Sequence, residues 1–206
     1  MGNSFVNLKT VQITADIVAL DADGISVAAA VGNNAALVIG GALADSGSVT
    51  LSHGRIVTIL SAGNDAAKSF TVTGTDINGD AQTESITGAN AGTATGTKYF
   101  LTISGISAVG NPAGNVSAGI NASAADVITI SAARLKGVAF TSTGTAGLLD
   151  FLTTSPSGTS VMKVGSVADA TATRDLFVPD EGTKFSSGIY LQYTVSTFLT
   201  MTVFHA

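Results

Sequence analysis

A histidine lies among serines in the first half of the sequence, and this pairing raises the question of nucleophilic catalysis. His53 follows Ser52, and Asp45 or Asp65 could complete a Ser-His-Asp triad. The nucleophile elbow Gly-x-Ser-x-Gly does not occur in the chain. Closeness in sequence is also no evidence of triad geometry, because triads are assembled from separate parts of a fold. The sequence therefore disfavours a hydrolase and predicts no catalytic residue, and the other histidine, His205, is interpreted as an exposed or interface residue.

Oxygen-bearing side chains recur at every second position from Asp76 to Asp80. Together with Asn78 and Glu84 they could surround a calcium ion, which prefers carboxylate and carbonyl oxygens. Gly79, however, precedes the third of these residues, whereas the glycine of an EF-hand loop follows it. Asn-Gly is also the favoured pair for a two-residue hairpin turn. We therefore predict a hairpin turn at Asn78-Gly79 with solvated aspartates, and neither a metal nor a cofactor.

Other classes of chemistry lack their usual residues. The chain has no cysteine, which excludes disulfide scaffolds, thiolate metal sites and thiol nucleophiles. Its glycine-rich stretch at residues 88–96 lacks the lysine of a P-loop and is interpreted as a loop. Nine cations are spread along the chain and form no basic stripe. The sequence therefore predicts no nucleic acid among the partners.

The composition indicates a folded, β-rich chain. Hydrophobic residues make up 45% of the 206 residues and charged ones 11%, which argues against charge-driven disorder. The 12 aspartates outnumber the two glutamates, and aspartate favours turns whereas glutamate favours helices. The charge-free windows 25–44 and 185–204 contain turn residues or alternate at period two, so we expect neither to span a membrane.

Alternation of apolar and polar residues at period two predicts antiparallel strands. They are expected at residues 26–44, 55–60, 69–73, 81–87, 98–104, 115–120, 127–131, 138–143, 148–153, 160–164, 175–178, 188–195 and 198–205. The texture changes near Arg134 and Lys136, after which most large apolar residues follow. We therefore predict an all-β protein of two antiparallel β-sandwich or jelly-roll-like domains with few helices, residues 1–133 and 134–206.

Two blocks of the sequence resemble tailed-bacteriophage virion structural proteins. The first is similar to a β-module of such proteins and comprises residues 55–65, 70–79, 83–92 and 98–100. The second is similar to the closing strands of small phage head and tail domains and comprises residues 177–182, 185, 188–190 and 202–204. The resemblance covers roughly 100 residues and carries no catalytic signature.

The resemblance implies a non-enzymatic decoration, or cement, protein on the outer surface of the capsid. It implies the major capsid protein as a partner and a homotrimer as the state of self-association; no membrane is expected. The alternative is a tail- or fibre-associated protein that binds a host-surface glycan or connects tail components. Aromatic side chains grouped in an exposed groove would favour that alternative.

The N-terminal segment matches nothing in the resemblance and is rich in apolar residues. Low charge and a mean hydropathy of +0.44 favour association through apolar burial and sheet edges instead of ion pairs. We expect residues 1–15 to leave their own domain and to add as a strand to a neighbouring subunit or to the capsid protein. The interface residues predicted there are Phe5, Val6, Leu8, Val11 and Ile13.

Overall fold

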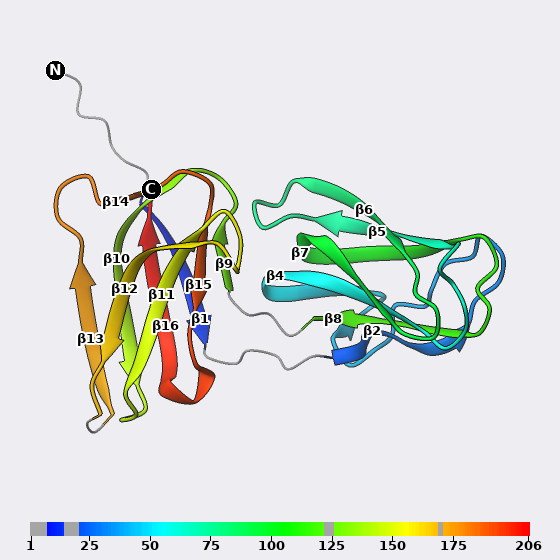
Figure 1. Ribbon diagram of the computed structural model, residues 1–206, viewed down its shortest axis with the longest axis horizontal. Helices are drawn as coiled ribbons and strands as arrows, with labels where there is room; N and C mark the ends of the chain where they lie inside the picture. The colour runs from blue at the N-terminus through cyan, green and yellow to red at the C-terminus, as the bar shows by residue number, and fades with distance from the viewer. Residues whose placement is uncertain (1–7, 15–20, 122–125, 169–170) are drawn as a thin grey trace, which may run out of the picture. The chain divides into compact units, whose positions relative to one another are not determined.

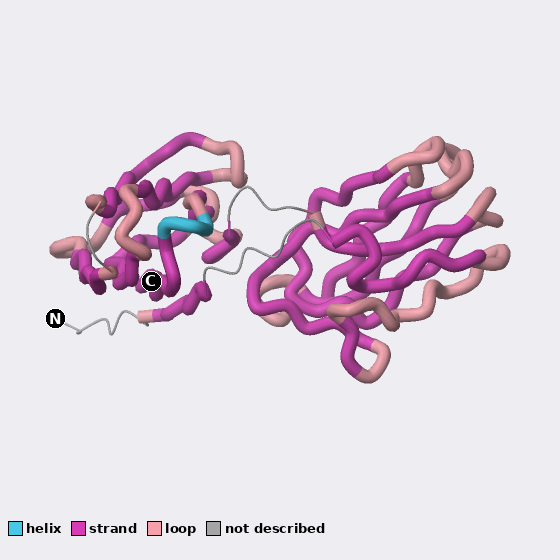
Figure 2. Tube along the Cα trace, turned by 90° about the horizontal axis from the view of Figure 1, so that it is seen from below, coloured by secondary structure: helices cyan, strands magenta, loops and turns pink. Residues whose placement is uncertain are grey.

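Strands make up most of the residues that the structure describes. The structure is a computed structural model that describes residues 8–14, 21–121, 126–168 and 171–206. Within these residues the one helical element is a short 3-10 turn, η1 (Val195–Thr197), and Figure 2 shows it among strands and loops. Every pairing between the named strands is antiparallel. The predicted all-β class with few helices is confirmed. In the described part of the chain no helix is long and apolar enough to cross a membrane.

The chain divides into two compact units that are interleaved in sequence. Residues 18–123 form one unit, here called the inserted unit. Residues 1–17 and 124–206 together form the other, here called the terminal unit. The predicted boundary between residues 133 and 134 is therefore wrong in two respects, since the division falls about ten residues earlier and the first strand belongs to the second unit.

The reason for this error lies in the strand that runs through the predicted boundary. Strand β10 (Ala133–Ser142) is continuous across Arg134 and Lys136, and Leu135 between them is fully buried. The change in composition there marks the start of the larger side chains of one core. It does not mark a linker.

The inserted unit is built on one seven-stranded sheet (Figure 1). Its strands follow the order β2-β8-β4-β7-β5-β6, and β3 pairs with β4. Their bounds are β2 (Asp21–Ala30), β3 (Ala44–Asp45), β4 (Ser48–Ser61), β5 (Ser69–Thr75), β6 (Ala81–Thr87), β7 (Thr93–Val109) and β8 (Asn115–Ile120). Side chains of alternating positions gather into one core that includes Val57, Phe70, Phe100 and Ile103.

The terminal unit consists of two sheets around a second core (Figure 1). One sheet has the order β1-β16-β10-β13, with β14 also on β10, and the other has the order β12-β11-β15-β9. The remaining bounds are β1 (Lys9–Thr14), β9 (Asp126–Thr129), β11 (Gly147–Thr153), β12 (Thr159–Ser166), β13 (Ala172–Phe177), β14 (Thr183–Phe185), β15 (Ile189–Gln192) and β16 (Phe198–His205). Edge-to-face contacts of Phe198 with Phe140 and Tyr193, at centroid distances of 5.5 and 6.3 Å, stabilise this core.

Most predicted strands are present, although several bounds differ, and three of the differences concern loops and turns. The strand expected at residues 26–44 ends at Ala30, and residues 31–43 form a long loop with one bridge, between Ala36 and Ser107. Strand β15 ends at Gln192 instead of continuing to Val195. The connection between β5 and β6 spans residues 76–80 and is longer than a two-residue turn.

Candidate interaction surface

An apolar groove lies on the outer face of the five-stranded sheet of the terminal unit. Its volume is about 350 Å³, and its lining includes Leu8, Phe177 and Phe204. Phe177 is 76% exposed and Leu8 57% exposed, and with Leu176 they form an exposed apolar patch on this sheet. The groove is therefore the candidate site for contact with a partner.

The strand register explains why these residues meet. Phe177 of β13 lies opposite Gly137 of β10, Gly137 lies opposite Phe204 of β16, and Phe204 lies opposite Thr10 of β1. Directly paired residues share one face of an antiparallel sheet. The two phenyl groups consequently flank a position that has no side chain, and this leaves room for a groove.

Gly137 is required by the close approach of β13. A β-carbon at this position would lie 2.6 Å from the carbonyl oxygen of Leu176, a backbone atom that cannot move without shifting the strand. The pairing of β10 with β16 also changes register between Leu135 and Gly137. Such an irregularity leaves one extra residue, Lys136, on the bulged strand.

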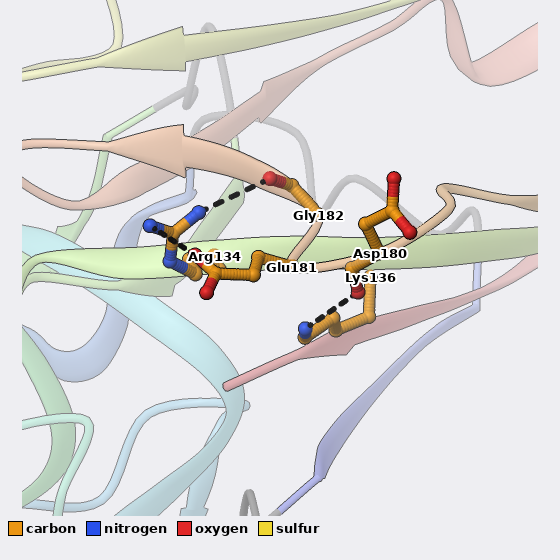
Figure 3. A network of polar contacts seen from close by, with 5 residues as sticks. All are labelled: Arg134, Lys136, Asp180, Glu181 and Gly182. Carbon is orange, nitrogen blue, oxygen red and sulfur yellow. Dashed lines mark hydrogen bonds and ion pairs between the residues drawn. The ribbon is translucent and has the colours of Figure 1, made fainter.

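A tight turn beside this bulge is held by the two cations nearest to it (Figure 3). Arg134 forms an ion pair with Glu181 at 2.9 Å, and its guanidinium donates to the carbonyl oxygen of Gly182 at 3.3 Å. The Lys136 ammonium donates to the carbonyl oxygen of Asp180 at 3.3 Å. Asp180 and Gly182 have φ values of 56° and 77°, so this turn contains two left-handed residues. Arg134 and Lys136 therefore order the turn between β13 and β14.

The predicted interface residues of the N-terminal segment fall into three groups. Phe5 and Val6 lie outside the described residues. Ile13 is 1% exposed in the terminal core, and Val11 packs against that core. Leu8 is exposed and lines the groove.

The expectation that this segment leaves its own domain is wrong for β1. This strand pairs with β16 of the same chain over six residue pairs, from Lys9–His205 to Thr14–Thr200. The apolar side chains of Val11 and Ile13 alternate at period two, so they face the core when β1 adds to β16. The segment is thus a strand-adding one, as expected, but its acceptor here is the same chain.

His53 lies in β4, where the pairing of β4 with β7 is irregular, and its contact with Ser52 is not that of a triad. Its Nδ1 is 2.9 Å from the hydroxyl oxygen of the adjacent Ser52. In a serine hydrolase the nucleophile bonds Nε2, and Nδ1 bonds the orienting carboxylate. Of the two aspartates considered, Asp65 instead accepts a hydrogen bond from the backbone N–H of Ala113 at 2.7 Å.

The aspartate-rich loop at residues 76–80 is closed by its own hydrogen bonds. The Asp76 carboxylate accepts from the backbone N–H groups of Asn78 and Asp80, at 2.8 and 3.0 Å. Gly79 has a φ of 87°, the left-handed value that glycine adopts readily. In the described part of the chain, no group of three or more histidine or acidic residues is placed to hold a metal ion.

Glu84, the fourth of the candidate calcium ligands, accepts hydrogen bonds from β7. Its carboxylate is buried and accepts from the backbone N–H of Thr97 at 2.6 Å, from the Thr97 hydroxyl at 2.9 Å and from the backbone N–H of Lys98 at 3.3 Å. On the same strand, the side-chain amide of Gln82 donates to the carbonyl oxygen of Tyr99 at 2.8 Å. Side chains of β6 thus bind backbone groups of β7, with which β6 forms no ladder.

His205 is buried, contrary to the expectation of an exposed or interface residue. It is 5% exposed and lies opposite Lys9 of β1 and Leu135 of β10. Burial lowers the pKa of its imidazole, and the positive charge of Lys9 lowers it further. The neutral imidazole is therefore the form that the folded terminal unit favours.

Sequence reasoning did not identify the groove. Phe177 is one of the large apolar residues that follow Arg134 and Lys136, and composition alone does not tell whether such a residue lies in a core or on a surface. A usable signal exists in β16, where Phe204 lies between the buried Val203 and His205 and must face outward. Comparison of the chain with protein-family models, curated proteins and solved structures finds no match.

Proposed function

We propose that this chain is a non-enzymatic structural protein of a tailed-bacteriophage virion. In this role it decorates the outer surface of the capsid and stabilises it by binding the lattice of the major capsid protein. The proposal rests first on the resemblance of the sequence to such proteins. The residues that carry the first block of the resemblance lie in β4 to β7 of the inserted unit. Those of the second block lie in the terminal unit, from Phe177 onward.

The observation that carries the proposal is the exposed apolar groove on a β-sheet. A protein that binds a lattice needs a surface that loses water on contact, and burial of phenyl and aliphatic groups supplies this. Phe177 and Leu8 offer such groups, whereas charged residues form only 11% of the chain. Attachment through this surface depends on apolar contact, because exposed ion pairs contribute only about 0–1 kcal/mol each.

Self-association is part of the proposal. Exposed apolar side chains on a sheet face are typical of interfaces, and a decoration protein commonly acts as a symmetric oligomer. Three copies are the number that the resemblance implies.

A second function is favoured by one specific observation. Phe177 and Phe204 line the same groove, and aromatic groups in a groove are what a glycan-binding tail or fibre protein would present. The rest of the groove supports this less well. A sugar has hydroxyl groups around its ring and needs several polar partners, while the charged lining residues are Lys136 and Asp175 and the others are apolar.

The two functions are separated by the copy number in purified virions. Decoration predicts hundreds of copies per particle, whereas a tail component is present in a handful or in dozens. We also expect the protein to stay on the particle in high salt, because apolar contacts are not screened. A low copy number, or release by moderate salt, would contradict decoration. Binding of a host-surface glycan that Phe177→Ala abolishes would support the alternative.

A further inference from the structure

The five-stranded sheet of the terminal unit presents two unlike margins. Within the described residues β13 pairs on one side, with β10, and β1 pairs on one side, with β16. Figure 1 shows β13 at the outer margin of this unit. The side chains of β13 from Thr173 to Phe177 are exposed, including Leu176 and Phe177. An edge strand that exposes large apolar side chains is a template for another strand.

Pairing of β13 with its own copy is disfavoured by charge. In a two-fold antiparallel pair, one residue must lie opposite its own copy. For overlap along most of β13, that residue is Arg174 or Asp175, which occupy the middle of the strand. Either choice places two like charges directly opposite each other, which destabilises a strand pair.

Strand β1 of another copy fits the same edge without this conflict. The strands of the sheet alternate in direction from β1 through β16 and β10 to β13. A translated copy therefore brings its β1 beside β13 in the antiparallel sense. The faces also match, because Val11 and Leu176 belong to one row across the sheet, with Val203 and Val138 between them.

We propose that copies of this chain associate head to tail, with β1 of one copy adding to β13 of the next. The register that continues each row places Val11 opposite Leu176 and Thr10 opposite Phe177. It also places Leu8 diagonally beside Phe177, so that the exposed residues at the two ends of the groove come together between copies. No like charges oppose each other in this register. Such a head-to-tail contact closes into a ring when its rotation permits and otherwise extends into a filament. The inference specifies the self-association in the proposed function and does not depend on the capsid as a partner.

Disulfide cross-linking tests this contact, because the natural chain contains no cysteine. The test protein is the full chain with Thr10→Cys and Phe177→Cys. Within one copy these positions lie three strands apart, roughly 14 Å at about 4.8 Å per strand, so a disulfide within the chain cannot form. Mild oxidation should therefore link separate copies, at least tenfold more than in either single-cysteine variant.

The controls decide between this contact and others. Cross-linking of a single variant to the same extent as the double variant would indicate β1–β1 or β13–β13 pairing and overturn the proposal. The proposal would also be overturned if the double variant associates but forms no disulfide on oxidation. A stable monomer at micromolar concentration would overturn it as well. None of these outcomes bears on the copy number in virions, so failure here and failure of the proposed function are distinguishable.

A charge placed at the edge gives an independent measurement. Phe177→Lys should weaken association at least tenfold in analytical ultracentrifugation, because lysine on an edge strand opposes strand addition. The matched control is Val38→Lys in the inserted unit, where the side chain is 79% exposed against 76% for Phe177. Equal weakening by both variants, or by neither, would contradict the role assigned to β13.

Discussion

The two units differ in what lies beside the margins of their strands. In the inserted unit, the loop at residues 31–43 covers strand margins, since Gly40 and Gly41 donate to the carbonyl oxygen of Ile25 and Leu37 donates to that of Ile106. Glu84 and Gln82 bind backbone groups of β7 in the same unit. In the terminal unit, β13 is left exposed beside a groove. Within the described residues both units have edge strands, β6 in one and β13 in the other, but the edge at β13 exposes a phenyl group beside the groove.

Polar side chains that bind backbone groups have different surroundings in the two units. Asp65 is fully buried in the inserted unit, where it joins two loops through Ala113. The cations Arg134 and Lys136 of the terminal unit serve an exposed turn. The terminal unit also has an internal polar contact, since the Tyr193 hydroxyl donates to the buried Asp126 carboxylate at 2.6 Å.

The largest expected effect tests whether the units are separate at all. Phe100→Ala should destabilise the inserted unit by about 3–5 kcal/mol, because it removes a fully buried phenyl group. Phe151→Ala should do the same to the terminal unit. Hydrogen exchange resolved by residue should show loss of protection in one unit only. Equal loss in both units for either variant would break the comparison.

The two glutamates of the chain provide the next comparison. Glu84→Ala should cost about 1.5–3 kcal/mol, because it removes hydrogen bonds to a charged acceptor and leaves backbone donors of β7 without it. Glu181→Ala should cost about 0–1 kcal/mol, because its ion pair with Arg134 is exposed. Chemical denaturation measures both. Similar costs would show that the interior of the inserted unit depends no more on side-chain acceptors than the surface turn does.

Two glycines, one in a strand of each unit, allow a comparison of how closely the backbones of neighbouring strands approach. Gly137→Ala should destabilise the terminal unit by about 1–3 kcal/mol, because the new methyl group would overlap the carbonyl oxygen of Leu176. Gly105→Ala in β7 is the control, since a β-carbon there would meet nothing within 4 Å. In thermal unfolding, the midpoint of the control should equal that of the natural protein or lie slightly above it. A neutral Gly137→Ala would mean that β13 is loosely held.

The smallest expected effect is a pH dependence confined to the terminal unit. Because burial lowers the pKa of His205 in the folded state, the unfolded chain binds a proton first as the pH falls. The contribution of neutral His205 is complete above the unfolded pKa, near 6.5, and is lost as the pH falls below it. The unfolding midpoint of this unit should therefore drop between pH 7 and 5, and His205→Gln should reduce the drop. If the unfolding midpoint of the variant depends on pH as steeply as that of the natural protein, other groups cause the effect.

The sequence predicted the fold class and many strand bounds because both depend on local alternation. Strand β6 begins and ends at the predicted residues, Ala81 and Thr87, and β16 at Phe198 and His205. Asn78-Gly79-Asp80 and Gly88 flank β6 on its two sides, so local information sufficed for this strand.

The unit boundary and the groove could not be predicted in the same way. The return of β1 to β16 depends on a pairing across almost the whole chain, which no local pattern records. The groove depends on Gly137 standing between Phe177 and Phe204, residues from three strands that only the register brings into one row. The predicted interface residues could not be sorted from the sequence either. Ile13 and Leu8 are both apolar, but Ile13 lies in the core and Leu8 is exposed.

Because β1 pairs with β16, the terminal unit cannot be completed until β16 has been synthesised. Lys9 is made before its partner His205, which follows 196 residues later. At about 5–20 residues per second this delay is roughly 10–40 s. The inserted unit is complete well before then and folds on microsecond to second timescales. During translation the nascent chain therefore carries a folded inserted unit together with the segment of β1, which has not yet paired with β16. The apolar residues Val11 and Ile13 of that segment are available to chaperones until β16 emerges.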